Sequence, residues 1–187
     1  MAQGGQGGQT LLLTIVPLGP LPPGVLDALA TSLAAIVPWE TAAAAPVAIP
    51  DAVSDGGQLD AREALTLLPR GSDSVLVTGV TERDLGVPGY NFVFGYAVPE
   101  HFRAAISLHR LHALKREAAA NDTMLLDRAG KEVLHEAGHL LGLGHCPDPS
   151  CVMHYSQTLQ DTDIKSERFC ARCSRELSRM PESQHQG

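Results

Sequence analysis

The sequence is poor in aromatic residues, has no long apolar run and has no excess of basic residues. Phe, Trp and Tyr make up 4% of the 187 residues, so Leu, Val, Ile and Ala must fill most of the core. No stretch of about 18 or more apolar residues occurs, which excludes a typical membrane-spanning helix. The formal net charge of −7 disfavours sequence-independent binding to nucleic acid, because such binding requires a basic surface.

The N-terminus also lacks basic residues ahead of its first apolar segment. Residues 1–9 form a Gly- and Gln-rich tail, which we expect to be disordered, and prolines directly follow the apolar run of residues 11–16. Because this arrangement differs from that of a secretory signal peptide, we expect a cytoplasmic protein. In a reducing cytoplasm, closely spaced cysteines favour metal binding over disulfide formation.

The remaining composition is that of a globular protein, with 44% hydrophobic and 19% charged residues. The length suits one domain, or one domain with a small appended lobe. We expect strands at 10–18, 74–80, 91–97 and 104–108, and consider a further short strand at 47–49. We expect helices at 24–37, 58–68, 125–141 and 174–180, with a surface loop in most of 39–57. The early alternation of strands and helices predicts an α/β (α+β) protein.

The segment HEAGHLLGLGH, residues 135–145, carries the strongest functional signal. His135 and His139 are four residues apart, so on a helix both imidazoles project from one face and can bind one metal ion. Glu136 follows the first histidine and suits a general base that acts on metal-bound water. The alternative is that this pattern arose by chance on an amphipathic helix.

Gly142 and His145, at fixed distances after the two histidines, make it a poor explanation that the pattern arose by chance. Gly142 can adopt a left-handed conformation and turn the chain sharply after the helix. His145 could then reach back as the third ligand. Three neutral imidazoles leave a zinc ion with one or two open positions, which lowers the pKa of bound water toward 7. We therefore predict a catalytic zinc site at the three histidines.

Cys151-Val152-Met153-His154-Tyr155 follows soon after this motif. Longer zinc peptidases with the HExxHxxGxxH pattern place a methionine-containing turn beneath the three histidines, and Met153 fits that role. An ordinary core methionine would pack in the same way. Tyr155 could donate a hydrogen bond to a developing oxyanion, or it could be a partly buried tyrosine with a satisfied hydroxyl.

The four cysteines form two close pairs. Cys146 and Cys151 lie at either end of a proline-containing loop, and Cys170 and Cys173 form a C-x₂-C pair. Four thiolates can bind a structural zinc ion tetrahedrally, which we predict as a second zinc per chain. The alternatives are two unrelated reduced pairs, or disulfides in an oxidising compartment. Because His145 and Cys146 are adjacent, the second zinc would hold the segment that delivers the third histidine.

The motif HEAGHLLGLGH followed by Cys146, Cys151-x-Met153 and Cys170-x₂-Cys173 resembles the archaemetzincin (archaelysin) family of zinc metallopeptidases, in the metzincin clan. Upstream segments within 79–111 resemble the same family. The resemblance implies a metzincin-like (zincin-like) fold with a twisted mixed sheet, an active-site helix and a small zinc-stabilised C-terminal subdomain. We accordingly divide the chain into a tail (1–9), an N-terminal subdomain (10–142) and a C-terminal subdomain (143–187).

The resemblance also implies the roles of the site residues. His135, His139 and His145 would bind catalytic zinc, the four cysteines would bind structural zinc, and Glu136 would be the base. Tyr155 stands where many relatives carry another aromatic residue. We predict a zinc metallopeptidase that hydrolyses peptide bonds by zinc-activated water, with a peptide or protein substrate and a monomeric state as the default.

Two rival functions remain open at this point. A catalytically silent protein could use the zinc for stability or for binding a peptide. A nucleic-acid-binding zinc ribbon is the other rival, and the acidic net charge argues against it. The segment 91–97 could border the cleft and pair with an extended peptide, or it could be an ordinary core strand. His109 and His112 are expected to be surface residues, and no partner for Arg110 is evident.

Overall fold

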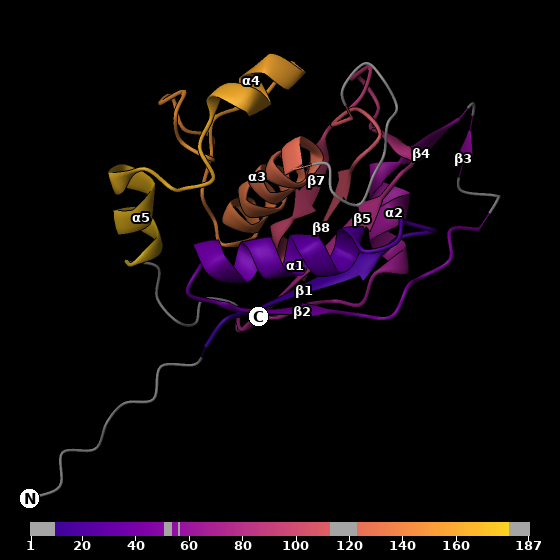
Figure 1. Cartoon of the computed structure of the whole chain (residues 1–187), viewed down its shortest axis with the longest axis horizontal. Helices are drawn as coiled ribbons and strands as arrows, with labels where there is room; N and C mark the ends of the chain where they lie inside the picture. Colours follow the sequence, from indigo (N-terminus) through magenta and orange to yellow (C-terminus); the bar gives the residue numbers. More distant parts are fainter. Residues whose placement is uncertain (1–9, 51–53, 56, 113–122, 180–187) are drawn as a thin grey trace, which may run out of the picture.

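A five-stranded sheet lies at the centre of the molecule (Figure 1). The computed structural model of the chain describes residues 10–50, 54–55, 57–112 and 123–179. In spatial order the strands are β2 (Glu40–Ala43), β1 (Leu12–Pro17), β5 (Val75–Thr81), β8 (Arg103–Ser107) and β7 (Gly95–Val98). The first four are parallel, and β7 runs antiparallel to β8. The predicted mixed sheet is confirmed, and β7 is one of its two edge strands.

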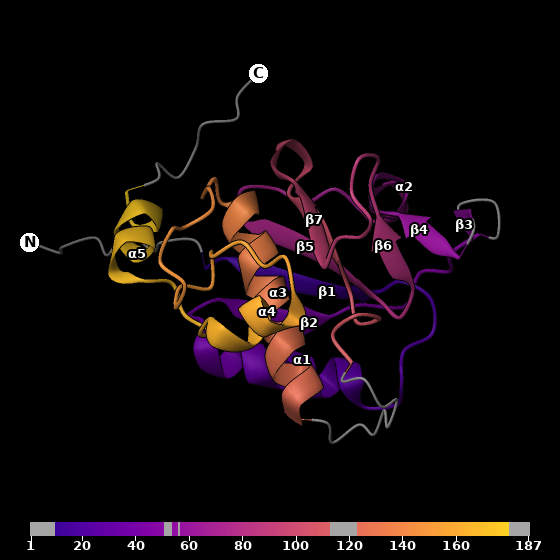
Figure 2. The same cartoon turned by 90° about the horizontal axis from the view of Figure 1, so that it is seen from above.

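Helices cover both faces of this sheet, as Figure 2 shows. On one face lie α1 (Val25–Ile36) and α3 (Thr123–Leu140), and on the other lies α2 (Ala61–Leu67). Successive side chains of a strand point to opposite faces, so β1 contributes to two cores. Its Leu13 and Ile15 pack with α1 and α3, whereas Val16 packs with α2. This strand is therefore buried on both faces of the sheet.

A second, three-stranded sheet lies beside α2. It contains β3 (Ser54–Asp55), β4 (Gln58–Asp60) and β6 (Asp84–Gly86), with β3 antiparallel and β6 parallel to β4. A short 3₁₀ helix, η2 (Pro99–His101), joins β7 to β8. The second sheet matters for function because β6 leads directly into the segment that borders the cleft described below.

The prediction of a surface loop through most of 39–57 is wrong for residues 40–43, which form the strand β2. Residues 40–43 pair in parallel with β1, with Thr41 opposite Leu13, so the backbone groups on the edge that faces β1 are paired by the sheet. At Val47 a single bridge to Leu18 replaces the short strand that we considered. These pairings depend on a strand 25 or more residues away, and nothing in the local composition indicates them.

Three other boundaries differ from the expected ones. Residues 58–60 form β4 instead of the first turn of a helix, and the Asp60 side chain caps α2 by accepting a hydrogen bond from the Arg62 backbone N–H at 2.9 Å. Only β7 of the expected strand 91–97 pairs with β8, and it extends to Val98. The last helix, α5 (Ala171–Leu177), begins three residues earlier than expected.

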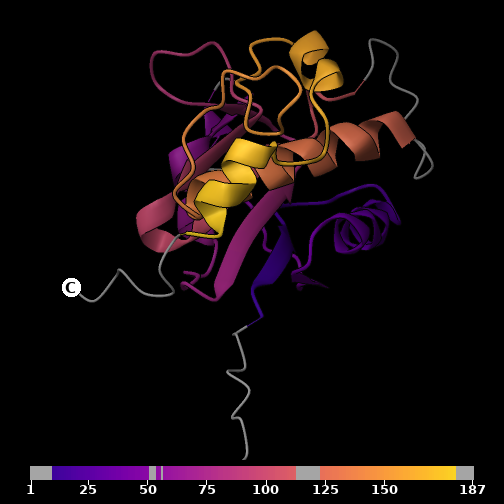
Figure 3. The ribbon, with the colours of Figure 1, turned by 90° about the vertical axis from the view of Figure 1, so that its left-hand side faces the viewer.

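The chain after α3 packs against that helix, as Figure 3 shows from the side. It contains α4 (Leu159–Ile164) and α5. Arg128 of α3 donates two hydrogen bonds to the Asp163 carboxylate, at 2.6 and 2.8 Å. The boundary between 10–142 and 143–187 stays a prediction, and the tail 1–9 lies outside the described residues. No helix within the described residues is long and apolar enough to span a bilayer.

Candidate active site and metal centres

The C-terminal end of α3 explains how the third histidine reaches the other two. Gly142 has a φ of 87°, the left-handed conformation that we predicted for it. The Leu143 N–H donates to the Gly138 carbonyl at 2.9 Å, and the Gly142 N–H donates to the His139 carbonyl at 2.9 Å. This pair of bonds is the Schellman motif, which ends a helix and reverses the chain direction. The segment beyond it therefore returns toward the helix.

The reversal brings His145 beside the two helical histidines. The ring centroid of His145 lies 5.3 Å from that of His135 and 4.8 Å from that of His139. One ring nitrogen from each histidine lies within 4.8 Å of the others. The three side chains are therefore placed to bind one ion together.

Hydrogen bonds fix which nitrogen of each helical histidine faces this point. Nδ1 of His135 lies 2.8 Å from the Val152 carbonyl, and Nδ1 of His139 lies 2.8 Å from the Leu143 carbonyl. A carbonyl oxygen only accepts, so each Nδ1 donates and each Nε2 carries a lone pair. The two Nε2 atoms are 3.1 Å apart. Two lone pairs at this distance repel unless a cation lies between them, so the donor set fits a metal ion.

The protonation preferences of the three rings agree with this arrangement. Burial is the main cause that lowers the pKa of all three histidines, and it lowers the pKa of His135 well below its usual value. Mutual repulsion between protonated rings adds to the effect. The rings are therefore neutral near pH 7, which is the form that binds zinc.

Glu136 is buried against the edge strand β7. Its side chain lies under Gly95, where a Cβ atom would overlap the carboxylate and lie 2.7 Å from Cγ. Glycine at this position is therefore what gives the carboxylate its space. Burial, with a smaller contribution from Glu132, raises the pKa of Glu136 to about 8. A divalent cation nearby shifts the same equilibrium back toward the ionised carboxylate.

Met153 lies beneath the helix, between the two histidines of α3. It is fully buried, and a Cβ atom on Gly138 would overlap its sulfur. Its carbonyl accepts a hydrogen bond from the Cys146 N–H at 2.8 Å, and the neighbouring Val152 carbonyl is the partner of His135. The predicted position of the methionine turn under the histidines is confirmed.

Tyr155 stands at the mouth of the site. Its ring centroid lies 4.8 Å from that of His145, and 42% of the residue is exposed. It lines the same cleft as the three histidines. The structure therefore places the ring close enough to the site for the predicted role in catalysis, and that role stays a prediction.

The four cysteines come together at a second point. The sulfur atoms of Cys146 and Cys170 are 3.8 Å apart, as are those of Cys151 and Cys173, and all four cysteines are free. No disulfide joins these four cysteines in the structure. Tetrahedral zinc with Zn–S bonds of about 2.3 Å requires sulfur atoms about 3.8 Å apart. The sulfur positions therefore fit a Cys₄ zinc site.

A cleft of about 750 Å³ runs past the histidines. One wall carries Glu136 and the three histidines, and the opposite wall is the segment 87–97, which we call the rim. The rim includes three of the four residues of β7. Of the two options for 91–97, the structure supports a position beside the cleft, with only its last three residues inside the sheet.

A polar network holds the rim, and sequence reasoning missed it. Asp84 accepts hydrogen bonds from Nε and Nη2 of Arg110, both at 2.7 Å, and from Nε2 of Gln58 at 2.9 Å. Gln58 also donates to the Asn91 carbonyl at 2.8 Å, and the Arg110 guanidinium lies 4.1 Å from the centre of the Phe92 ring. Arg110 thus has a partner 26 residues earlier, at a separation that no local spacing rule indicates.

Two other histidines lie away from both clusters. His109 is exposed, as expected. His112 differs from the expected surface position, because its side chain is only 11% exposed and its Nε2 lies 3.0 Å from a carboxylate oxygen of Glu82. Neither belongs to a group of three metal-ligating side chains among the described residues.

The Asp84 network predicts a stability contribution that depends on pH. Burial by itself would raise the pKa of Asp84, but hydrogen bonds from Arg110 and Gln58 outweigh it, so the pKa is lowered. A carboxyl with a lowered pKa stabilises the fold above its unfolded pKa of about 4, and the contribution is lost as pH falls through the folded value.

We therefore expect Asp84→Asn to lower the free energy of unfolding by about 2 kcal/mol at pH 7 and by much less at about pH 3. Urea denaturation at both pH values measures the difference. Asp73→Asn, at an exposed aspartate, is the control and should change little at either pH. An equal cost of Asp84→Asn at both pH values would show that the charge of this carboxylate does not matter.

Comparison with known proteins matches the part of the chain that contains both clusters of metal-ligating side chains. The family model of peptidase family M54 matches residues 70–179. The archaemetzincin of Pyrococcus furiosus is 47% identical over 114 residues, which cover 61% of this chain and 59% of that protein. The archaemetzincin of Natronomonas pharaonis is 35% identical over 169 residues, covering 87% of this chain and 97% of that protein.

A solved structure extends the likeness to most of the chain. The crystal structure of archaemetzincin from Methanopyrus kandleri superposes with a TM-score of 0.78 at 32% sequence identity, covering 94% of this chain and 97% of that one. The alignment to the Pyrococcus furiosus protein spans about three fifths of its length, whereas these other two span nearly all of theirs. By sequence and by fold, the chain belongs to the archaemetzincin family, peptidase family M54.

Proposed function

We propose that this protein is a zinc-dependent metallopeptidase that hydrolyses peptide bonds with Glu136 as the general base. The observation that carries the proposal is the convergence of three imidazole nitrogens beside a buried carboxylate in a cleft. Membership of a peptidase family supports the same reaction class. The four unbridged thiols suit a reducing compartment such as the cytoplasm.

His135, His139 and His145 would hold the catalytic zinc ion. Three neutral nitrogen ligands are a donor set that zinc prefers, and they leave open positions for water and substrate. Zinc in such a site lowers the pKa of a coordinated water toward 7 and polarises a carbonyl oxygen. The Val152 and Leu143 carbonyls keep the two helical imidazoles in the orientation that metal binding needs.

Glu136 would move the proton in this reaction. Its carboxylate accepts a proton from the attacking water and returns it to the nitrogen of the leaving amine. The position next to His135 on the helix directs it to the same wall of the cleft as the histidines. Gly95 provides the space in which it can do so, because any larger residue there would displace the carboxylate.

The edge strand β7 would orient the substrate. Only one of its edges pairs, with β8, so the other edge presents backbone N–H and C=O groups. Its residues Tyr96 and Ala97 line the cleft. An extended peptide can add to such an edge by main-chain hydrogen bonds, which places a peptide bond next to the histidines. A peptide or protein substrate is the class that this geometry fits.

The Cys₄ group would hold a second, structural zinc ion. The Cys170 thiol is partly ionised near neutral pH, because a hydrogen bond from the Cys173 backbone N–H, the largest of several contributions, lowers its pKa to about 7. Since Cys146 follows His145 directly, an ion at the sulfurs restrains the segment that delivers the third imidazole. We therefore propose two zinc ions per chain, with the structural one supporting the catalytic one.

Glu136→Gln tests the proposed reaction most sharply. The variant keeps the shape of the side chain and all seven metal ligands, so we expect two zinc ions per chain and a fall in kcat of about 10³-fold or more. Metal analysis and cleavage of a peptide library measure both quantities. Glu100→Gln, on η2 outside the cleft lining, is the matched control and should retain activity. If zinc-loaded wild-type protein cleaves no peptide, the alternative of a silent zinc- and peptide-binding protein is favoured.

Tyr155→Phe tests the proposed oxyanion contact. Loss of a hydrogen-bond donor used only in the transition state should lower kcat about 10²-fold and leave KM nearly unchanged. Tyr90→Phe, at an exposed tyrosine on the rim, is the control. An unchanged kcat for Tyr155→Phe on a well-cleaved peptide would remove the tyrosine from the mechanism.

Replacing all four cysteines by serine tests the coupling of the two metal sites. We expect the loss of one zinc ion per chain and at least about tenfold weaker zinc binding at the histidines, measured by competition with a chelator. His109→Ala removes an exposed histidine outside both clusters and should change neither value. Undiminished zinc affinity at the histidines in the cysteine-free variant would show that the sites are independent.

A further inference from the structure

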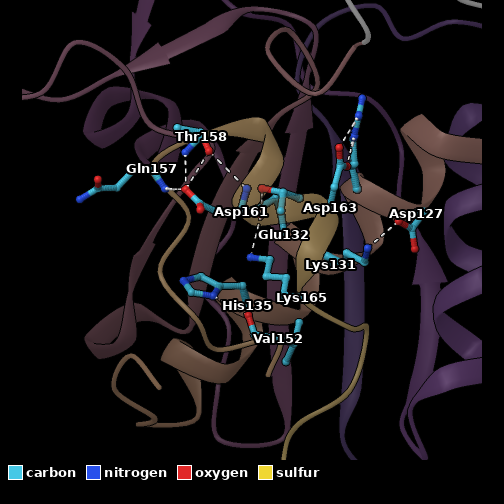
Figure 4. Close-up of polar contacts among 12 residues, drawn as sticks. Asp127, Lys131, Glu132, His135, Val152, Gln157, Thr158, Asp161, Asp163 and Lys165 are labelled. Atoms are coloured by element: carbon cyan, nitrogen blue, oxygen red, sulfur yellow. Dashed lines mark hydrogen bonds and ion pairs between the residues drawn. The ribbon is translucent and has the colours of Figure 1, made fainter. Parts of the chain in front are cut away.

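A buried ion pair lies on the wall of the cleft that carries the histidines. The Lys165 ammonium lies 2.8 Å from Oε1 of Glu132, with side-chain exposures of 0% and 3% (Figure 4). Thr162, also fully buried, donates a hydrogen bond from its hydroxyl to the same oxygen at 3.2 Å. The pair joins α3 to the residue that directly follows α4, two segments that are far apart in the sequence.

The carboxylate of this pair, and not the ammonium, faces the cleft. Glu132 lines the cleft together with Glu136, which lies one helical turn further along α3 on the same face. Lys165 and Thr162 both contact Oε1, and no residue that the structure describes hydrogen-bonds to Oε2. Lys165 is fully buried and does not line the cleft. A ligand in the cleft therefore contacts the Glu132 carboxylate and not the Lys165 ammonium.

Stability alone is a weak reason for such a pair. The removal of two charges from water costs several kcal/mol per ion, and well-packed apolar side chains often serve as well or better. A second polar atom in the same cleft also lacks a partner. The hydroxyl oxygen of Ser156 is buried, lines the cleft and makes no hydrogen bond within the described part of the chain. Of the two, Oε2 belongs to a carboxylate of a residue that lines the cleft and can accept a hydrogen bond from a ligand.

We propose that Glu132, held in place by Lys165, selects the substrate side chain that enters the cleft next to the scissile peptide bond, and that it favours Lys or Arg. This inference rests on the proposed peptidase activity and names its substrate class. Lys165 acts through Glu132 as a positioning residue, because its ammonium holds Oε1 and no described residue hydrogen-bonds to Oε2.

Basic, apolar and acidic substrate side chains should differ in how well they bind next to the Glu132 carboxylate. A basic side chain donates a charge-assisted hydrogen bond to Oε2. An apolar side chain removes water from Oε2 and leaves it unpaired, which a polar site penalises strongly. An acidic side chain places one carboxylate against another, which disfavours its binding.

The experiment measures kcat/KM of the zinc-loaded protein on peptides that differ at the residue on each side of the cleaved bond. At one of the two positions we expect Lys or Arg to exceed Leu by about tenfold and Glu by about a hundredfold. The variant Glu132→Leu/Lys165→Met removes both charges together, which avoids leaving one charge buried. It should retain zinc and lose the preference for basic side chains, with Leu now cleaved as well as Lys.

A second ion pair on the same helix provides the control. Lys131 lies 2.7 Å from Asp127, and neither residue lines the cleft. Asp127→Leu/Lys131→Met makes the same chemical change and should leave the preference intact. If Glu132→Leu/Lys165→Met does not fold, Glu132→Gln is read instead, because it keeps the shape, removes the negative charge and should reduce the Lys-over-Glu ratio about tenfold.

The outcomes separate this inference from the proposed function. Cleavage without any preference for basic side chains overturns the inference and leaves the peptidase activity standing. A preference that survives both Glu132 variants overturns it as well, because another residue must then be responsible. Failure of the zinc-loaded wild-type protein to cleave any peptide overturns the proposed function and this inference with it.

Discussion

The histidines at the end of α3 present unprotonated nitrogens to one another at 3.1 Å, and neutral imidazoles tolerate that approach only around a cation. Much of the neighbouring structure serves this arrangement. The glycine turn after α3 returns His145, and the Val152 and Leu143 carbonyls set the tautomers of the helical pair. The methionine turn fits beneath the helix because Gly138 has no side chain.

The same helix connects the metal site to substrate recognition. Along its length it presents Glu132, His135, Glu136 and His139 to the cleft, so the selection, proton transfer and metal binding that we propose share one rigid element. The opposite wall of the cleft is held separately by the Asp84 network. Because the two walls are fixed by different interactions, a change in the rim should alter substrate binding more than it alters metal binding.

Sequence reasoning placed side chains together correctly where their geometry depends on local spacing. The histidine motif, the Gly142 turn and the cysteine pairs are read from residues a few positions apart, because helical periodicity and ligand geometry act at that range. It failed where partners are distant. No sequence pattern near β2 indicates its pairing with β1, and no sequence pattern indicates that Asp84 pairs with Arg110. Residues 91–94 have a strand-like sequence, yet they lie outside the strand, because Val93 forms a single bridge with Leu85 of β6 and only Phe94 bonds to the end of β8.

The central claim is that three imidazoles converge on one zinc ion with Glu136 beside it and not bound to it. Anomalous diffraction at the zinc edge, from crystals of the zinc-loaded protein, tests this directly. The account predicts one anomalous peak within about 2.1 Å of one ring nitrogen from each histidine and a second peak among the four sulfurs, about 2.3 Å from each. It is contradicted if the first peak is absent, or if the three rings point apart.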